Sequence, residues 1–144
     1  MIDTFHQDLA RGIQIEEKIL AVIKQKYPLA YRKEGLFKGY DIWIPELQIG
    51  VEVKADEKSN YTGNIVVEIE FNGKPSALAT TTADYWVWYD GNFTWFKTES
   101  IRDCIKNYTP VRFTGKGDSK EKLAYLIPKS ELWCYKEYKN YKIR

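Results

Sequence analysis

The segment from Ile49 to Lys54 restricts the fold more than any other part of the sequence. Within it, Val51 and Val53 alternate with Glu52 and Lys54. Side chains two residues apart in a β-strand point to the same side. The pattern therefore predicts a strand that buries its valines and holds Glu52 and Lys54 together on the other face.

A second strand is expected directly before this one, over residues 36–44. The connector Pro45-Glu46-Leu47-Gln48 makes the two strands look like a hairpin. Such a hairpin can bring Asp41 alongside Glu52. The sequence thus predicts two carboxylates and one ammonium group in a small volume.

The remaining pattern predicts an α/β fold in one domain spanning residues 1–144, with residues 110–144 as a C-terminal extension of the same domain. A long helix is expected from Asp3 to Lys26, because apolar residues recur there at helical spacing and Pro28 follows. Further strands are expected at 64–71, 84–89, 93–97, 111–113 and 123–127, and helices at 75–80, near 98–108 and after Pro128. We expect a central mixed sheet flanked by helices, with strand 64–71 next to the Glu-Val-Lys strand if the sheet is built in order.

Composition excludes several kinds of catalysis. His6 is the only histidine, which excludes Ser-His-Asp hydrolysis, two-histidine ribonuclease chemistry and zinc sites with several histidines. No glycine-rich phosphate-binding loop is present. Cys104 and Cys134 are predicted to be reduced thiols. Without a membrane-spanning stretch or signal-peptide pattern, we expect a protein of the cytoplasm of a cell or a phage-infected host.

Crowded carboxylates repel each other unless a positive charge lies between them. Magnesium meets this need with oxygen ligands, and manganese is expected to substitute for it. A bound cation can bridge a phosphate and acidify water. Asp41 and Glu52 are therefore the predicted metal ligands, and Lys54 is predicted to orient or deprotonate the attacking water.

On these residues the chain resembles the PD-(D/E)xK nuclease superfamily. Asp41 matches the family's first acid and Glu52-Val53-Lys54 matches its Glu-x-Lys, whereas Tyr40 stands where the motif's name has proline. The resemblance implies a restriction-endonuclease-like core in αβββαβ order and a magnesium-dependent DNA endonuclease. Small members include Holliday junction resolvases. The alternatives are a sequence-specific restriction or homing endonuclease and, from another class, a non-catalytic nucleic-acid-binding module.

The family often adds a glutamate from its first helix. Glu16 projects close to the apolar stripe of the predicted helix, whereas Glu17 points away, so Glu16 is the predicted accessory acid. The Val53 carbonyl is a further expected metal ligand. Glu68, more than Glu70, is expected to contribute an extra ligand from the third strand.

DNA contacts are expected from basic residues near the predicted site and in loops: Arg32, Lys33, Lys38, Lys58 and Lys74. Duplex or branched DNA is the expected partner. By analogy with enzymes that cut two strands, a homodimer is expected. The aromatic segment 85–89 is predicted to pack in the core rather than to stack on bases.

Overall fold

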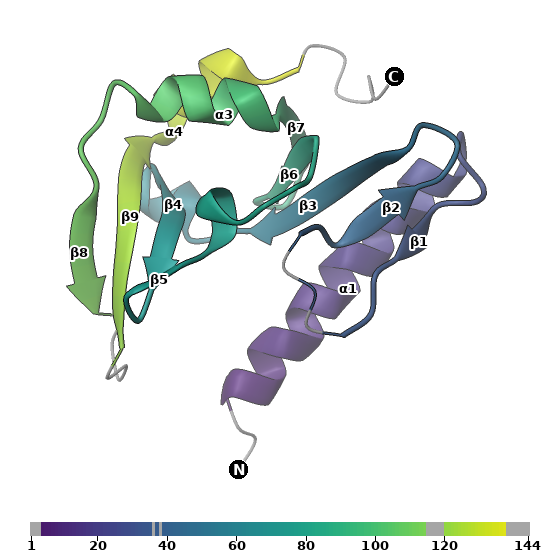
Figure 1. The fold of residues 1–144 in the computed structure, drawn as a ribbon, viewed down its shortest axis with the longest axis horizontal. Coiled ribbons are helices and arrows are strands. Elements are labelled where there is room, and N and C mark those ends of the chain that lie inside the picture. The colour runs from purple at the N-terminus through teal and green to yellow at the C-terminus, as the bar shows by residue number, and fades with distance from the viewer. Residues whose placement is uncertain (1–3, 36, 38, 115–119, 138–144) are drawn as a thin grey trace.

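The computed structural model describes residues 4–35, 37, 39–114 and 120–137. Figure 1 shows two β-sheets with the long helix α1 (Thr4–Lys24) against one of them. Helix α1 matches the predicted first helix apart from its last residues and continues through Gly12. Its length follows from apolar residues spaced four apart, of which Ile15, Ile19 and Ile23 are buried.

The first sheet has five strands in the order β1-β2-β3-β6-β7. They are β1 (Tyr31–Arg32), β2 (Ile42–Ile44), β3 (Ile49–Ala55), β6 (Tyr85–Tyr89) and β7 (Phe93–Lys97). Strands β3 and β6 are parallel, whereas the other neighbours are antiparallel. The prediction of an α/β fold with a mixed sheet and flanking helices is confirmed.

The two faces of the first sheet pack into two separate clusters. On one face, Val51 and Val87 pack with Ile19 and Ile23 of α1. On the other face, Trp86 and other aromatic residues pack against the second sheet and helix α3 (Thr98–Ile105). All of β6 is buried, which confirms that the aromatic segment belongs to the core.

The second sheet has four strands in the order β5-β4-β9-β8. They are β5 (Lys74–Pro75), β4 (Asn64–Phe71), β9 (Glu121–Pro128) and β8 (Val111–Thr114). The C-terminal region therefore completes this sheet by pairing with β4. Two short helices lie between strands, α2 (Ser59–Thr62) and η1 (Ala77–Ala79), and two more follow β9, α4 (Lys129–Leu132) and η2 (Trp133–Tyr135).

The predicted neighbour of β3 is wrong. Strand β4 has the predicted bounds, but it pairs with β9 and β5 in the second sheet, while β6 lies beside β3. The five consecutive buried residues of β6 suit a central position. Strand β4 has one exposed side, and α2 with the left-handed Gly63 (φ 73°) separates it from β3.

The predicted strand 36–44 is also too long. Of the described residues in this range (37 and 39–44), Ile42–Ile44 alone form β2, and Tyr31–Arg32 form a separate short strand against it. Both cysteines are free thiols, as predicted. Among the residues with a described position, no helix combines the length and apolar character needed to cross a membrane.

Gly50 and Gly12 give a matched test of this packing. A Cβ at Gly50 would lie 2.8 Å from the Tyr40 ring, whereas one at Gly12 would meet nothing within 4 Å. We expect Gly50→Ala to lower the free energy of unfolding by about 1–3 kcal/mol through overpacking. Gly12→Ala should raise it by about 0.5–1 kcal/mol, because alanine favours the helix. Urea denaturation of both variants measures the difference, and equal effects would contradict this packing.

Candidate active site

Asp41 stands where β2 and β3 separate. Ile42 still pairs with Val51, and the Asp41 N–H donates to the Val51 carbonyl at 2.9 Å. One step further, the Val53 N–H donates to Asp41 Oδ2 at 2.7 Å. In a continued β2–β3 ladder, a main-chain carbonyl of the neighbouring strand would accept this hydrogen bond. Here the Asp41 carboxylate accepts it instead. This bond fixes the carboxyl group beside β3.

The main chain before Asp41 is held from the other side. The Gly39 carbonyl accepts hydrogen bonds from the Thr82 N–H at 3.0 Å and from the Thr81 hydroxyl at 3.1 Å. A Cβ at Gly39 would lie 2.6 Å from the Thr82 hydroxyl, so the close approach requires glycine. The Asp41 carbonyl accepts from the Lys33 N–H at 2.7 Å. These bonds leave the acid little freedom.

Glu52 and Lys54 share one face of β3, as the alternation predicts. Their side chains form an ion pair with 3.2 Å between Lys54 Nζ and Glu52 Oε2. Lys54 Nζ also lies 5.4 Å from the centre of the Trp86 ring on β6. The ring face attracts the ammonium group and restricts its position. Lys54 is 35% exposed and Glu52 is 13% exposed, so the amine reaches solvent while the acid is nearly covered.

Glu16 joins these residues from α1. Its side chain is 19% exposed, whereas that of Glu17 is 53% exposed, so the geometric choice between them is confirmed. Arg32 on β1 contacts both acids, with Nη1 3.5 Å from Glu16 Oε1 and Nε 3.4 Å from Glu17 Oε1. The structure therefore gathers Glu16, Asp41 and Glu52 with two cations, Arg32 and Lys54.

Burial dominates the electrostatics of this cluster. It raises the pKa of Glu52 to about 7; the adjacent Lys54 opposes this rise and the charge of Asp41 adds to it. Burial and then the charge of Asp41 raise the pKa of Glu16 to about 7, against the effect of Arg32. Burial likewise raises the pKa of Asp41, despite the Val53 hydrogen bond and the nearby cations. At neutral pH the folded protein therefore holds Glu16 and Glu52 partly protonated, because burial outweighs the nearby cations.

The donor set fits a hard divalent cation, although not as a complete cage. Over the described ranges, no three His, Cys, Asp or Glu side chains form a group that could hold a metal ion. Asp41 and Glu52 supply carboxylate oxygens. The Val53 carbonyl points to the same side as its N–H, toward Asp41, because both groups of a strand residue point one way. Two carboxylates and one carbonyl leave room for the waters that magnesium retains.

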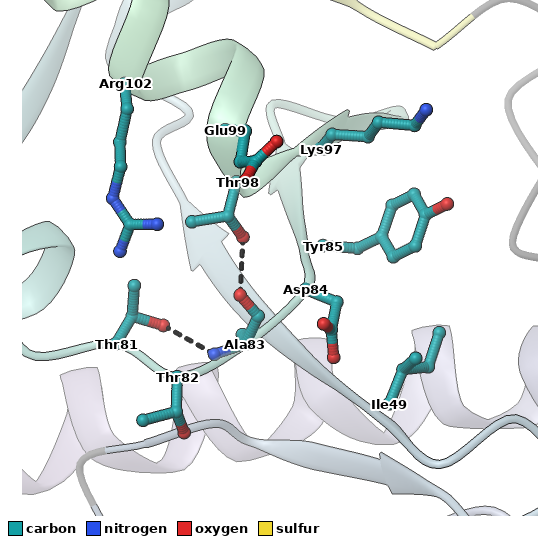
Figure 2. Close-up of a pocket in the computed structure, with 10 residues that line it drawn as sticks. All are labelled: Ile49, Thr81, Thr82, Ala83, Asp84, Tyr85, Lys97, Thr98, Glu99 and Arg102. Atoms are coloured by element: carbon teal, nitrogen blue, oxygen red, sulfur yellow. Dashed lines mark hydrogen bonds between the residues drawn. The ribbon is translucent and has the colours of Figure 1, made fainter.

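Figure 2 shows a separate pocket of about 450 Å³ at the other end of β3, where Ile49 begins the strand. Two of its threonines, Thr81 and Thr98, bind the main chain through their hydroxyl groups. The Thr98 hydroxyl donates to the Ala83 carbonyl at 2.7 Å, and the Ala83 N–H donates to the Thr81 hydroxyl at 3.2 Å. Thr81 also donates to the Gly39 carbonyl and so supports the main chain that holds Asp41.

The structure does not bring Glu68 to the cluster, and the strand order that placed it there is wrong. Glu68 alternates with Val67, which faces the core, so its side chain points away from the first sheet. It accepts a hydrogen bond from the Ser76 hydroxyl at 2.7 Å. Glu70 lies 3.7 Å from Arg112 in an ion pair.

The predicted DNA contacts fall in several places. Lys33 is exposed, with Nζ 5.2 Å from the centre of the Phe37 ring. Lys58 is exposed at the start of α2, and Lys74 is exposed on β5 in the second sheet. Lys38 lies outside the described residues.

Sequence reasoning missed two supporting roles. It assigned Arg32 to DNA and did not foresee its contact with Glu16. It also did not foresee that Trp86 lies under Lys54. No local pattern could have revealed either contact, because each joins elements that meet only in the folded chain.

Comparison of the chain with protein-family models, with curated proteins and with solved structures finds no match. Any function proposed for this chain therefore rests on the geometry and electrostatics of the cluster alone.

The raised pKa of Glu52 predicts how stability changes with pH. Between its ordinary value of 4.5 and about 7, folded Glu52 binds a proton that the unfolded chain has released. The free energy of unfolding of the metal-free protein should therefore fall as pH rises through this window. Glu52→Gln should reduce that fall by about 1–3 kcal/mol between pH 5 and pH 8. Urea denaturation in EDTA measures it.

Glu34→Gln is the control, because Glu34 is exposed. It controls for the loss of one carboxyl group, and we expect its profile to lie closer to the parent profile than that of Glu52→Gln does. A Glu52→Gln profile that overlays the parent profile would show that Glu52 ionises in the folded protein as it does in water.

Proposed function

We propose that this chain is a divalent-cation-dependent endonuclease that hydrolyses phosphodiester bonds in DNA by direct attack of water. The observation that carries the proposal is the meeting of Asp41, Glu52 and Lys54 where β2 and β3 separate. Partly buried acids whose pKa values are raised together, beside a partly exposed amine, are typical of functional sites rather than of solvated strand faces.

Asp41, Glu52 and the Val53 carbonyl would hold the cation, which is magnesium in this proposal, with manganese able to replace it. When bound, the cation supplies Lewis-acid stabilisation of the phosphoryl oxygens and a more acidic water. The hydrogen bond from Val53 occupies Asp41 Oδ2 and holds the carboxyl group in one orientation. This preorganisation lowers the entropic cost of binding the cation.

Lys54 acts on the reacting groups. Its ammonium lies 3.2 Å from Glu52 Oε2 and remains partly exposed, so it can donate to a phosphate oxygen or to the attacking water. Contact with the Trp86 ring holds the amine on the reacting side of β3. Positioned charge of this kind stabilises the transition state because little reorganisation is needed during the reaction.

Glu16 and Arg32 complete the arrangement. Glu16 supports the site through a water molecule or a second ion, in line with its burial and its interaction with Asp41. Arg32 holds Glu16 by an ion pair and is close enough to Asp41 to affect its charge. The guanidinium therefore balances part of the acidic charge and can also contact a DNA phosphate.

The substrate in this proposal is duplex or branched DNA, with Lys33 and Lys58 as exposed phosphate contacts near the first sheet. A homodimer would place two such sites on two strands. Holliday junction resolution is the specific activity proposed. A sequence-specific restriction or homing enzyme with the same site is separated from it by the substrate that is cut.

Cleavage by Lys54→Ala tests the chemistry. We expect this variant to lose at least about 10²-fold in cleavage rate while it stays folded, because the positioned amine is removed. The measurement uses labelled four-way junction, duplex and single-stranded DNA, each with magnesium, with manganese and with EDTA. Lys24→Ala, at an exposed lysine at the end of α1, is the matched control and should cleave like the parent.

If Lys54→Ala cleaves as fast as the parent, the proposed mechanism is wrong. If the parent binds DNA but cuts none of the three substrates with either metal, the non-catalytic binding module becomes the better reading. Preferential cutting of the junction supports resolution, and cutting at one duplex sequence supports the restriction or homing alternative.

Cation binding is tested separately by thermal unfolding. At a free magnesium concentration about tenfold above the dissociation constant, the parent should gain about 1.4 kcal/mol of stability at pH 8. Asp41→Asn should lose this gain, because it removes a charged ligand, whereas Lys54→Ala should keep it. An equal gain in Asp41→Asn and the parent would place the cation elsewhere.

A further inference from the structure

One row of side chains crosses the whole second sheet. Phe71 on β4 pairs directly with Lys74 on β5 and with Lys122 on β9, and Lys122 pairs with Phe113 on β8. Directly paired residues of antiparallel strands share a face. Lys74, Phe71, Lys122 and Phe113 therefore form a continuous line, called here the Lys–Phe row.

The Lys–Phe row lies on the outer face of this sheet. On β9, Lys122 shares a face with Leu126, because they are four residues apart. Leu126 is 46% exposed and its partner Val66 is 40% exposed, whereas Ile65 and Ile127 on the inner face are fully buried. Figure 1 shows the second sheet on the side of the molecule away from α1.

A β-bulge turns Phe71 to this face. The register shifts between Glu68 and Glu70, so that two steps along β4 match one step along β9. This extra residue places Glu70 on the inner face and Phe71 on the outer face. The chain thus presents a half-exposed aromatic ring between two lysines where an unbroken ladder would have presented a glutamate.

Charge separates across the same sheet. Lys120 joins the row, with its Nζ 5.8 Å from the centre of the Phe71 ring, and Lys122 Nζ lies 6.0 Å from that centre. Glu70 and Glu121 pair with Arg112 instead, and their alternation with Phe71 and Lys122 puts them on the inner face. The outer face is therefore positive around Phe71 and Phe113, while Glu68 lies in the next row of that face and accepts a hydrogen bond from Ser76.

We propose that the Lys–Phe row binds a single-stranded segment of DNA, with bases stacked on Phe71 and Phe113 and phosphates paired with the lysines. Half-exposed rings beside cations suit such binding, since every base has a π-face and every nucleotide a charge. The DNA identity rests on the proposed function. In that context the row would hold an unpaired segment beside the duplex of a branched substrate, such as an opened arm of a four-way junction.

The spacing favours a single strand over a duplex. Phe71 and Phe113 lie two strands apart, which is about 10 Å. Bases stacked in a duplex are about 3.4 Å apart along each strand and keep their faces covered by their neighbours. Only unstacked bases can place their faces on both rings. A fully paired junction would use the lysines but leave the rings unused.

Binding is measured by fluorescence anisotropy of a labelled 15-nucleotide single strand and of the matching duplex, with the full chain in EDTA. Phe71→Leu and Phe113→Leu keep an apolar side chain but remove the stacking face. We expect each to weaken single-strand binding by about fivefold or more and to leave duplex binding unchanged. Lys74→Glu should weaken binding by about tenfold and reduce the salt slope by about 0.7 or more.

Lys24→Glu carries the same charge change at an exposed position on α1 and is the matched control. Thermal unfolding of each variant confirms that it is folded, and Lys74 is chosen because it is exposed on an edge strand. The proposal is overturned if Lys24→Glu weakens binding as much as Lys74→Glu, if the two leucine variants bind like the parent, or if the parent prefers the duplex.

This result is independent of catalysis. EDTA prevents cleavage, so the anisotropy reports binding alone. A chain that binds through the Lys–Phe row but never cuts DNA would refute the proposed function alone. The role of the row alone would be refuted by a different result. In that case Phe71→Leu and Phe113→Leu would cut a forked substrate at the parent's rate and bind single strands like the parent.

Discussion

The hydrogen bond from the Val53 N–H to the Asp41 carboxylate is the contact on which the candidate site depends. It ends the pairing of β2 with β3 and still satisfies the main chain of β3. It also sets the distance between Asp41 and Glu52. This one hydrogen bond therefore contributes both to the fold and to the site. Hydrogen bonds from Thr81 and Thr82 to the Gly39 carbonyl, and from Lys33 to the Asp41 carbonyl, keep it in place.

The acid cluster is a region where the protein gives up stability. Three partly buried carboxyl groups have raised pKa values, because burial disfavours their charged forms more than the two nearby cations favour them. Well-packed apolar residues would be more stable there. A site that binds a cation benefits from this state, because the ion relieves repulsion that already exists, and such trade-offs between stability and activity are common.

The sequence predicted the parts of the site that depend on local periodicity. Alternation in β3 placed Glu52 and Lys54 on one face, and the helical angle separated Glu16 from Glu17. It could not place β4, because its main partner β9 lies more than fifty residues further along the chain and either sheet could have accepted a strand with one apolar side. The contact of Arg32 with Glu16 was invisible for the same reason, since it joins two elements that meet only after folding.

Strand β6 belongs to both apolar clusters at once. Trp86 and Trp88 pack on one side of it, while Tyr85 and Val87 pack on the other. Loss of packing in either apolar cluster would therefore loosen a strand that the other cluster also needs. The two clusters should unfold as one cooperative unit. Because β6 is also the neighbour of β3, damage to either interior reaches Glu52 and Lys54 through the same backbone ladder.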